Sequence, residues 1–375
     1  MKKGLVVKKS SVKGLGTIYF YFGHSASSEN VGERGLSHMA EHLLCHSFDH
    51  LLPRITASSI SYNAFTSDNH VVFYWTGLDE KLNELESEFV KIFDFVPTKE
   101  QFENERNIIL QEYTQYMADQ NSIYQNINRK YYDYYGPIGC RSDIESITYE
   151  DFLTFYSRFK HPTIIYRVTN NKKSDVKEIY KNVVYKNPVK LGKLKKSELL
   201  IEASSTFPDS VKLCDWFDVS EFNKFELDFL GGMYSDGLES PLYQEIREKR
   251  GLVYGLGLYS EEFRNVRTAS FVAMCSPNNV DEVRTIAKEV MTNPEQYLTQ
   301  ERFEIIKSAI VTGEKIKLLQ NHGTGSITND IVYGEEYFDN ISNITYARIL
   351  EVANMFKKKI ETEMRLASFG DKLEI

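Results

Sequence analysis

The sequence has few cysteines, no long apolar run and no excess of positive charge, and each absence excludes a class of protein. Its four cysteines are scattered and form no C-x-x-C pair, which argues against a disulfide framework and against a cysteine zinc site. No apolar run approaches the roughly 20 residues of a membrane span. The net charge of −8 is the reverse of what a general nucleic-acid binder carries. We therefore expect neither membrane nor nucleic acid among the partners of this chain.

The N-terminus begins like a secretory signal but does not continue as one. The apolar run from Leu5 to Val7 is far too short for a signal peptide, and Lys8 and Lys9 end it. Together with the scattered cysteines, this predicts a cytoplasmic protein in a reducing compartment.

The sequence does contain enough apolar material for two packed cores. The chain has 375 residues, of which 42% are hydrophobic and 13% aromatic. This length exceeds that of one ordinary domain, so two domains are expected. β-Branched and aromatic stretches predict strands at 16–23, 69–77 and 162–169, and apolar spacing predicts helices at 80–95 and around 98–117.

Two segments of the first half resemble segments of the second half. The stretch SITYEDFLTFYSRF (146–159) resembles NITYARILEVANMF (343–356), an offset of 197 residues. In the same way 97–112 resembles 298–313, an offset of 201 residues. Two matches at nearly one offset indicate an internal duplication, with chance similarity of short segments as the alternative.

A lysine-rich stretch at 170–198 separates the two halves. Its lysines are not interleaved with stacking aromatics, so it is interpreted as a solvated surface segment and linker. We therefore expect a first domain at 1–182 and a second at 183–375.

Residues 38–42 read H-M-A-E-H and suggest a metal site. On a helix, His38 and His42 lie one turn apart on the same face, so both imidazoles can point at one ion. Glu41 lies beside them, where it can hold a water molecule without being a ligand. A catalytic zinc site needs these parts: protein ligands, an open position and a base. The motif therefore predicts His38 and His42 as ligands and Glu41 as the catalytic base.

A third ligand is expected from the stretch FENERNIILQEY at 102–113. Glu105 and Glu112 are seven residues apart, so they lie only about 20° apart around a helix, on its apolar side. Burying two carboxylates there is costly unless a cation compensates. This predicts Glu112 as a metal ligand and Glu105 as the carboxylate that supports a ligand histidine. The alternative is that both glutamates edge the apolar stripe and reach solvent.

Two further histidines, His46 and His50, continue the four-residue spacing. A competing ligand pair of His42 with His46 is possible, but it would leave Glu41 without its place beside the water. We interpret His46 and His50 as solvated or locally hydrogen-bonded.

With these residues identified, the chain resembles the inverzincin zinc peptidases, the family of pitrilysin, insulin-degrading enzyme and the mitochondrial processing peptidase. The stretch ERNIILQE (105–112) fits the family's E-R-x-x-I-x-x-E pattern, which carries its third ligand. The segment 61–74 resembles the family's N-A-x-T strand, and 136–156 resembles the segment that closes its first domain. The segment 231–257 resembles its second-domain signature. The resemblance covers nearly the whole chain.

The resemblance implies an α+β fold with two similar domains, each a mostly antiparallel sheet backed by helices, that enclose a chamber. It also implies one zinc ion per chain, and relatives of this size often pair as a homodimer or as a heterodimer with a related subunit. The sequence departs from the family where ASSISYN (57–63) replaces a Gly-Gly before the N-A-x-T strand. The separation of 70 residues between His42 and Glu112 is also slightly short.

The resemblance further implies four substrate-binding residues. Arg247 and Tyr254 match the arginine and tyrosine with which the family's second domain holds substrate. Asn63 and Ala64 lie on the strand whose edge the family offers to a peptide as an added β-strand. The structural alternatives are that Arg247 is a cation at a helix C-terminus and that Tyr254 is an ordinary strand aromatic.

These inferences predict a zinc metalloendopeptidase that cleaves short or unfolded peptides, such as a precursor or leader peptide. Glu41 would take a proton from the attacking water and pass it to the leaving amine. The alternative is a non-catalytic peptide-binding subunit that supports an active partner of the same family. A purely structural zinc site is disfavoured, because such sites usually have four protein ligands.

Overall fold

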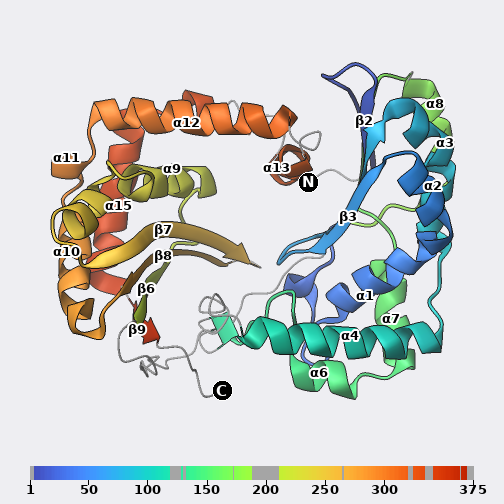
Figure 1. Cartoon of the computed structure of the whole chain (residues 1–375), viewed down its shortest axis with the longest axis horizontal. Coiled ribbons are helices and arrows are strands. Elements are labelled where there is room, and N and C mark those ends of the chain that lie inside the picture. Colours follow the sequence, from blue (N-terminus) through green and yellow to red (C-terminus); the bar gives the residue numbers. More distant parts are fainter. Residues whose placement is uncertain are drawn as a thin grey trace. The chain divides into compact units, whose positions relative to one another are not determined.

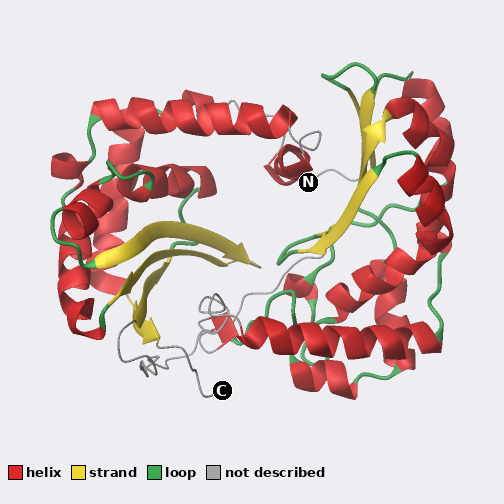
Figure 2. Ribbon diagram, in the orientation of Figure 1, coloured by secondary structure: helices red, strands yellow, loops and turns green. Residues whose placement is uncertain are grey.

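The computed structural model describes residues 4–118, 128–129, 132–171, 173–187, 211–263, 266–319, 324–333, 341–363 and 365–369. They form two compact units, each with its own sheet (Figures 1 and 2). Unit 1 comprises 1–125, 134–192 and 316–335, and unit 2 comprises 126–133, 193–315 and 336–375. Each unit thus takes a short segment from the other half of the chain. The predicted domain bounds, 1–182 and 183–375, were based on an internal duplication of the sequence. The two spatial units do not test that duplication, so these bounds stay a prediction.

Unit 1 holds a five-stranded sheet in the order β1-β5-β2-β4-β3. Strands β1 and β5 pair in parallel, and the other described pairs are antiparallel. Strand β3 lies at one edge. The strands are β1 (Gly4–Lys9), β2 (Leu15–Phe22), β3 (Ser61–Thr66), β4 (Val71–Leu78) and β5 (Ile164–Thr169).

One face of this sheet packs against helices to form the main core of unit 1. Alternate residues of β2, namely Ile18, Phe20 and Phe22, point into this core because successive side chains of a strand lie on opposite faces. The helices that contribute to it include α1 (Leu36–Cys45), α3 (Asp79–Phe89), α4 (Lys99–Ala118) and α7 (Tyr149–Phe159). Short helices complete the unit: α2 (Leu52–Ala57), α6 (Arg141–Ser146), α8 (Lys173–Ile179) and 3₁₀ turns at Ala26–Ser28, His46–Leu51 and Val90–Asp94.

The opposite face of the sheet is covered by a helix from the second half of the chain. Helix α13 (Thr324–Tyr333) buries Ile327 and Ile331 against Tyr19 and other residues of this face. The hydroxyl of Tyr19 also shares a hydrogen bond with Thr328. Residues more than 300 positions apart in sequence therefore complete one unit.

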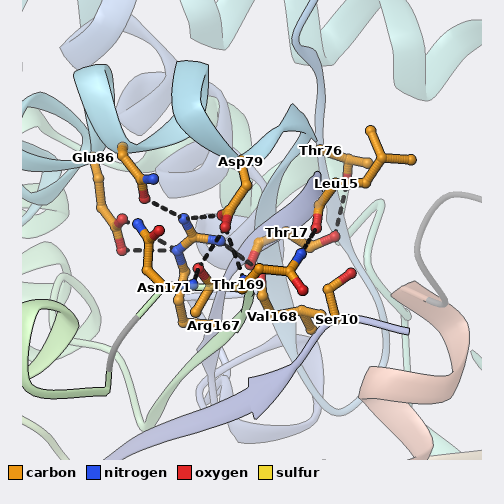
Figure 3. A network of polar contacts seen from close by, with 12 residues as sticks. Ser10, Leu15, Thr17, Thr76, Asp79, Glu86, Arg167, Val168, Thr169 and Asn171 are labelled. Atoms are coloured by element: carbon orange, nitrogen blue, oxygen red, sulfur yellow. Dashed lines mark hydrogen bonds and ion pairs between the residues drawn. The ribbon is translucent and has the colours of Figure 1, made fainter. Parts of the chain in front are cut away.

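A buried charged network ties α3 to the sheet (Figure 3). The Arg167 side chain on β5 is fully buried and donates from Nε to both carboxylate oxygens of Glu86, each at 3.1 Å. Its Nη2 donates to Asp79 Oδ1 and to Asn83 Oδ1, both at 2.8 Å. Asp79 in turn accepts from Thr169 Oγ1 at 2.8 Å. The network therefore satisfies charges that would be costly to bury alone.

Unit 2 holds a four-stranded antiparallel sheet in the order β7-β8-β6-β9. Its core is apolar, and β6, β7 and β8 pack against α9, α10, α12 and α15. The strands are β6 (Val211–Asp218), β7 (Val253–Phe263), β8 (Val266–Cys275) and β9 (Arg365–Phe369). The helices are α9 (Lys224–Ser235), the π-helix η5 (Tyr243–Glu248), the 3₁₀ turn Pro277–Asn279, α10 (Val280–Thr292), α11 (Pro294–Tyr297), α12 (Gln300–Leu319) and α15 (Tyr346–Glu363).

The predicted α+β class, with two sheets backed by helices, is confirmed. The matching helices α4 and α12 have 20 residues each and begin 201 residues apart, at the offset of the sequence match. One boundary differs: the helix predicted at 80–95 is α-helical only to Phe89 and continues as the 3₁₀ turn Val90–Asp94. β-Branched and aromatic residues follow Phe89 there, and they lower helix propensity.

Among the described residues, every helix is too short or too polar to cross a lipid bilayer.

Candidate metal centre

Helix α1 places the predicted ligands, and a buried carboxylate fixes its start. Glu29 accepts hydrogen bonds from the backbone N–H of Gly35 at 2.8 Å and of Ser37 at 2.6 Å, two donors that the first turn leaves free. Gly35 has a φ of 108°, in the left-handed region that favours glycine. The apolar side of α1 is buried in the core of unit 1, so His38 and His42 face the other way and stay partly accessible.

Three predicted ligands lie together in unit 1. The Nε2 atoms of His38 and His42 are 3.2 Å apart. Glu112 Oε2, from α4, lies 3.6 Å from His38 Nε2 and 3.8 Å from His42 Nε2. Helices α1 and α4 lie side by side, which brings residues about seventy positions apart to one point (Figure 1). In the described part of the chain, these three residues form the one cluster with metal-ligand spacing.

The geometry of this cluster fits a zinc ion. Ligands about 2.0–2.1 Å from a tetrahedral zinc are about 3.3 Å from one another, close to the three separations found here. Two imidazole nitrogens that face each other at 3.2 Å need a proton or a cation between them. Burial, together with the neighbouring His42, lowers the pKa of His38 to about 3, so this imidazole is neutral near pH 7. A neutral imidazole is the form that binds a metal.

Glu105 supports the cluster from α4. Its Oε2 lies 2.9 Å from His42 Nδ1, the nitrogen on the far side of the ring from Glu112. Its Oε1 lies 3.0 Å from His46 Nε2. Glu105 therefore lies where the sequence predicted a carboxylate that orients a ligand histidine.

Glu41 is almost completely buried, beside the cluster. Burial raises the pKa of Glu41, and the charge of Glu112 raises it further. Thr66 Oγ1 donates a hydrogen bond to Glu41 Oε2 at 2.8 Å, which favours the carboxylate. A carboxylate that burial pushes towards a higher pKa is a stronger base for proton transfer.

The predicted peptide-binding strand is the edge strand of this sheet. Asn63 and Ala64 lie on β3, paired with Tyr74 and Phe73 of β4 on one side. Asn63 is exposed, and Ala64 packs against the core of unit 1. The other side of β3 has no partner strand in the described sheet, as a strand that accepts an added peptide requires.

Arg247 and Tyr254 belong to unit 2 and contact each other. The Arg247 guanidinium lies 5.6 Å from the centre of the Tyr254 ring, within the range of a cation–π interaction. Arg247 lies on the π-helix η5, a rare geometry that is frequent at functional sites. The Tyr254 side chain is 83% exposed, unusual for a large aromatic. Tyr254 lies on β7, as the structural alternative has it, but its side chain is not packed into the core of unit 2.

The sequence did not assign two residues of this region. Thr66 contacts Glu41 and lies in the N-A-x-T segment, so the motif contained a signal for it. His46 was interpreted as solvated or locally hydrogen-bonded, and it does bond locally, with its Nδ1 2.7 Å from Asp49 Oδ2. Its contact with Glu105 had no signal in the spacing, because that contact depends on how α4 packs.

Comparison with known proteins finds proteins named as proteases and matches described as a peptidase M16 inactive domain. A family model described as "Peptidase M16 inactive domain" matches residues 192–310. A protein from Rickettsia bellii named "uncharacterized zinc protease" is 23% identical, with 87% of this chain and 86% of that protein covered. YmxG of Bacillus subtilis, also named an uncharacterized zinc protease, is 22% identical, with 92% of this chain and 90% of that protein covered.

Solved structures share the fold across almost the whole chain. A protease from Helicobacter pylori superposes with a TM-score of 0.79 at 17% identity, over 98% of this chain and 97% of that one. A structure from Pseudomonas fluorescens, described as a peptidase M16 inactive domain, has a TM-score of 0.76 at 14% identity, over 98% and 95%.

The described residues combine a two-sheet architecture with an H-x-x-E-H helix beside a glutamate-bearing helix in one unit, the arrangement that the sequence predicted for a metallopeptidase. The chain resembles the peptidase M16 family, the inverzincins, as the motifs predicted: a family model matches residues 192–310, two relatives are named zinc proteases, and solved structures share the fold. The matched family model covers neither His38 nor Glu112, since it begins at residue 192.

Proposed function

We propose that this chain is a zinc-dependent endopeptidase that cleaves extended or unfolded peptides. The observation that carries the proposal is the cluster of His38, His42 and Glu112 with Glu41 beside it. Three protein ligands and a neighbouring base are the pattern of a catalytic zinc site, whereas a structural site closes its coordination with a fourth ligand. The names of the two zinc protease relatives support zinc as the metal.

The residues divide the reaction between them. When bound, zinc would act as a Lewis acid and lower the pKa of a water molecule. His38 and His42 would hold it through their Nε2 atoms, and Glu105 would fix the ring of His42. Glu41 accepts a proton from the attacking water as the new carbon–oxygen bond forms. It then gives this proton to the leaving nitrogen as the peptide carbon–nitrogen bond breaks.

Substrate binding is proposed for both units. The free edge of β3 would pair with the main chain of an extended peptide, so Asn63 and Ala64 would contact substrate without demanding one sequence. Arg247 and Tyr254 of unit 2 would also contact peptide substrate, with Arg247 donating to a carbonyl and Tyr254 donating from its hydroxyl. Their exposure and mutual contact support this role.

The test is mass spectrometry of a pool of unfolded peptides incubated with three proteins: wild type, Glu41→Gln and Glu100→Gln. Glu100 is an exposed glutamate on α4 and serves as the matched control. Loss of a general base costs about 10²–10⁴-fold in rate, so Glu41→Gln should bind zinc yet leave the peptides nearly intact. Glu100→Gln should cleave like the wild type.

Two results would contradict the proposal. Equal cleavage by wild type and Glu41→Gln would exclude Glu41 as the base. If the zinc-loaded wild type cleaved no peptide, the chain would instead be a non-catalytic, peptide-binding subunit. The family model that matches residues 192–310, described as an inactive domain, suggests this alternative. Peptide pull-down with the same pool would then show binding without cleavage.

A further inference from the structure

His46 is connected to the candidate metal centre through Glu105. It lies one turn beyond His42, at the start of the 3₁₀ turn that follows α1. Each oxygen of Glu105 has one histidine partner: Oε2 lies 2.9 Å from His42 Nδ1, and Oε1 lies 3.0 Å from His46 Nε2. The other ring nitrogen of His46 lies 2.7 Å from Asp49 Oδ2. The contacts form an unbroken series from a candidate ligand to an exposed aspartate.

The position of Glu105 makes its second contact important. Only 8% of Glu105 is exposed, so solvent cannot replace a lost partner for both oxygens. A nearly buried carboxylate with one unpaired oxygen is costly, and it would turn towards solvent. That turn weakens its hydrogen bond to His42 Nδ1. That bond sets which nitrogen of His42 carries the proton and how the ring is turned.

We propose that His46 is a positioning residue of the candidate metal centre: it holds Glu105 in place, and Glu105 in turn fixes the ring of His42. This inference rests on the zinc site of the proposed function. It differs from the earlier alternative of His46 as a ligand, because both of its ring nitrogens face carboxylates.

If His46 acted only through its charge, its removal would change zinc affinity in the opposite direction. Burial lowers the pKa of His46, but hydrogen bonds to Asp49 and Glu105 outweigh burial and raise it, which favours the positively charged form of the ring. A positive charge near a cation site opposes metal binding. If charge dominated, removing His46 would tighten zinc binding. If positioning dominates, removing it weakens zinc binding.

The experiment measures zinc affinity by competition with a chelating dye for wild type, His46→Leu, His46→Gln and His50→Leu. Loss of a direct hydrogen-bond partner of a ligand histidine lowers metal affinity by about 10–100-fold. His46 contacts the ligand only through Glu105, so His46→Leu should weaken zinc binding by about three- to tenfold. Glutamine can place an amide N–H near the position of Nε2, so His46→Gln should stay within about twofold of wild type. His50 is exposed on the same 3₁₀ turn, and His50→Leu should bind like wild type.

A double-mutant cycle separates positioning from general damage to the fold. In a Glu105→Ala background, His46→Leu should cause no further loss, because the residue through which it acts is gone. Melting temperatures of the metal-free variants report separately on folding. An equal loss in both backgrounds, unchanged affinity of His46→Leu, or tighter binding by both His46 variants would each overturn this inference alone. Failure of the wild type to bind one zinc ion would overturn the proposed function and, with it, this inference.

Discussion

At the scale of single residues, Glu41 depends on a hydrogen bond from another element. It lies on α1, whereas its donor Thr66 lies at the end of β3. This contact holds the carboxylate in one orientation inside a nearly buried site. A general base must be aligned with the proton it removes, so its orientation matters as much as its basicity.

We therefore expect Thr66→Val to lower kcat/KM by about tenfold, equivalent to the roughly 1.4 kcal/mol of one hydrogen bond. Zinc affinity should not change, because Thr66 contacts no proposed ligand in the described contacts. Thr66→Ser keeps the hydroxyl and should recover most of the activity. Peptide cleavage kinetics on zinc-loaded proteins measure the effect, and a Thr66→Val variant as active as wild type would refute it.

Helical spacing predicted how the residues of the candidate centre lie within each of its two helices. His38, Glu41 and His42 share one helix, so the period of 3.6 residues fixes their relative positions before any packing is known. The same holds for Glu105 and Glu112 on α4. The contacts of Thr66 and His46 were not predictable in this way, because each crosses from one element to another and depends on tertiary packing.

At the scale of elements, the Arg167 network holds α3 against the sheet. Arg167→Met would leave the carboxylates of Glu86 and Asp79 buried without their cation. We expect a loss of roughly 3–5 kcal/mol in the free energy of unfolding, measured by urea denaturation. Arg141→Met removes an exposed ion pair with Glu145 and should change stability by less than about 1 kcal/mol.

The double variant Arg167→Met with Glu86→Leu should be more stable than Arg167→Met alone, because it removes one of the unpaired charges. If Arg167→Met were no less stable than Arg141→Met, the network would not anchor α3 as described.

The turn between β3 and β4 carries a half-buried histidine, His70, which we expect to make unit 1 sensitive to acid. Burial lowers the pKa of His70 to about 4, and its ring stacks on Tyr21. The unfolded chain binds this proton near pH 6.5, so between pH 6.5 and 4 the unfolded state holds more protons than the folded state. The contribution of neutral His70 to the free energy of unfolding is therefore fully present above pH 6.5, and it is lost as the pH falls towards 4.

We expect His70→Phe, which keeps an aromatic ring but cannot be protonated, to remove this dependence. Between pH 7 and pH 5, wild type should lose about 2 kcal/mol of unfolding free energy relative to His70→Phe, from the shift of the pKa. Chemical denaturation in the presence of a chelator excludes effects of metal release. His50→Phe changes an exposed histidine and should follow the wild type. Parallel pH profiles for wild type and His70→Phe would show that His70 does not titrate in this window.

Local sequence patterns predicted which helices and strands exist better than the residues at which they begin and end. Thr148 starts α7 with a capping box that includes Asp151, a signal readable in the sequence. No comparable signal marks the change from α1 to a 3₁₀ turn at His46, where the helical spacing of the histidines continues. Such ends are set by packing, which a single sequence does not contain.

At the scale of the whole molecule, the chain does not divide cleanly at its middle. Helix α13 belongs to the second half in sequence but completes the core of unit 1. The apolar spacing of Ile327 and Ile331 predicts a helix with one buried face, yet nothing in that spacing states which sheet the face covers. This is why the sequence could suggest a duplication but could not predict the exchange of segments between the two units.

We expect Ile331→Asp to destabilise unit 1 although Ile331 lies in the second half of the chain. A charge placed against Tyr166 and the other buried residues of that face should cost about 2–4 kcal/mol. In hydrogen–deuterium exchange, peptides from β2 should lose protection, whereas peptides from β6 in unit 2 should not. Ile305→Asp, at an exposed position of α12, should leave both unchanged. If Ile331→Asp instead raised exchange in β6 and spared β2, α13 would stabilise unit 2, and the assignment of this helix to unit 1 would be wrong.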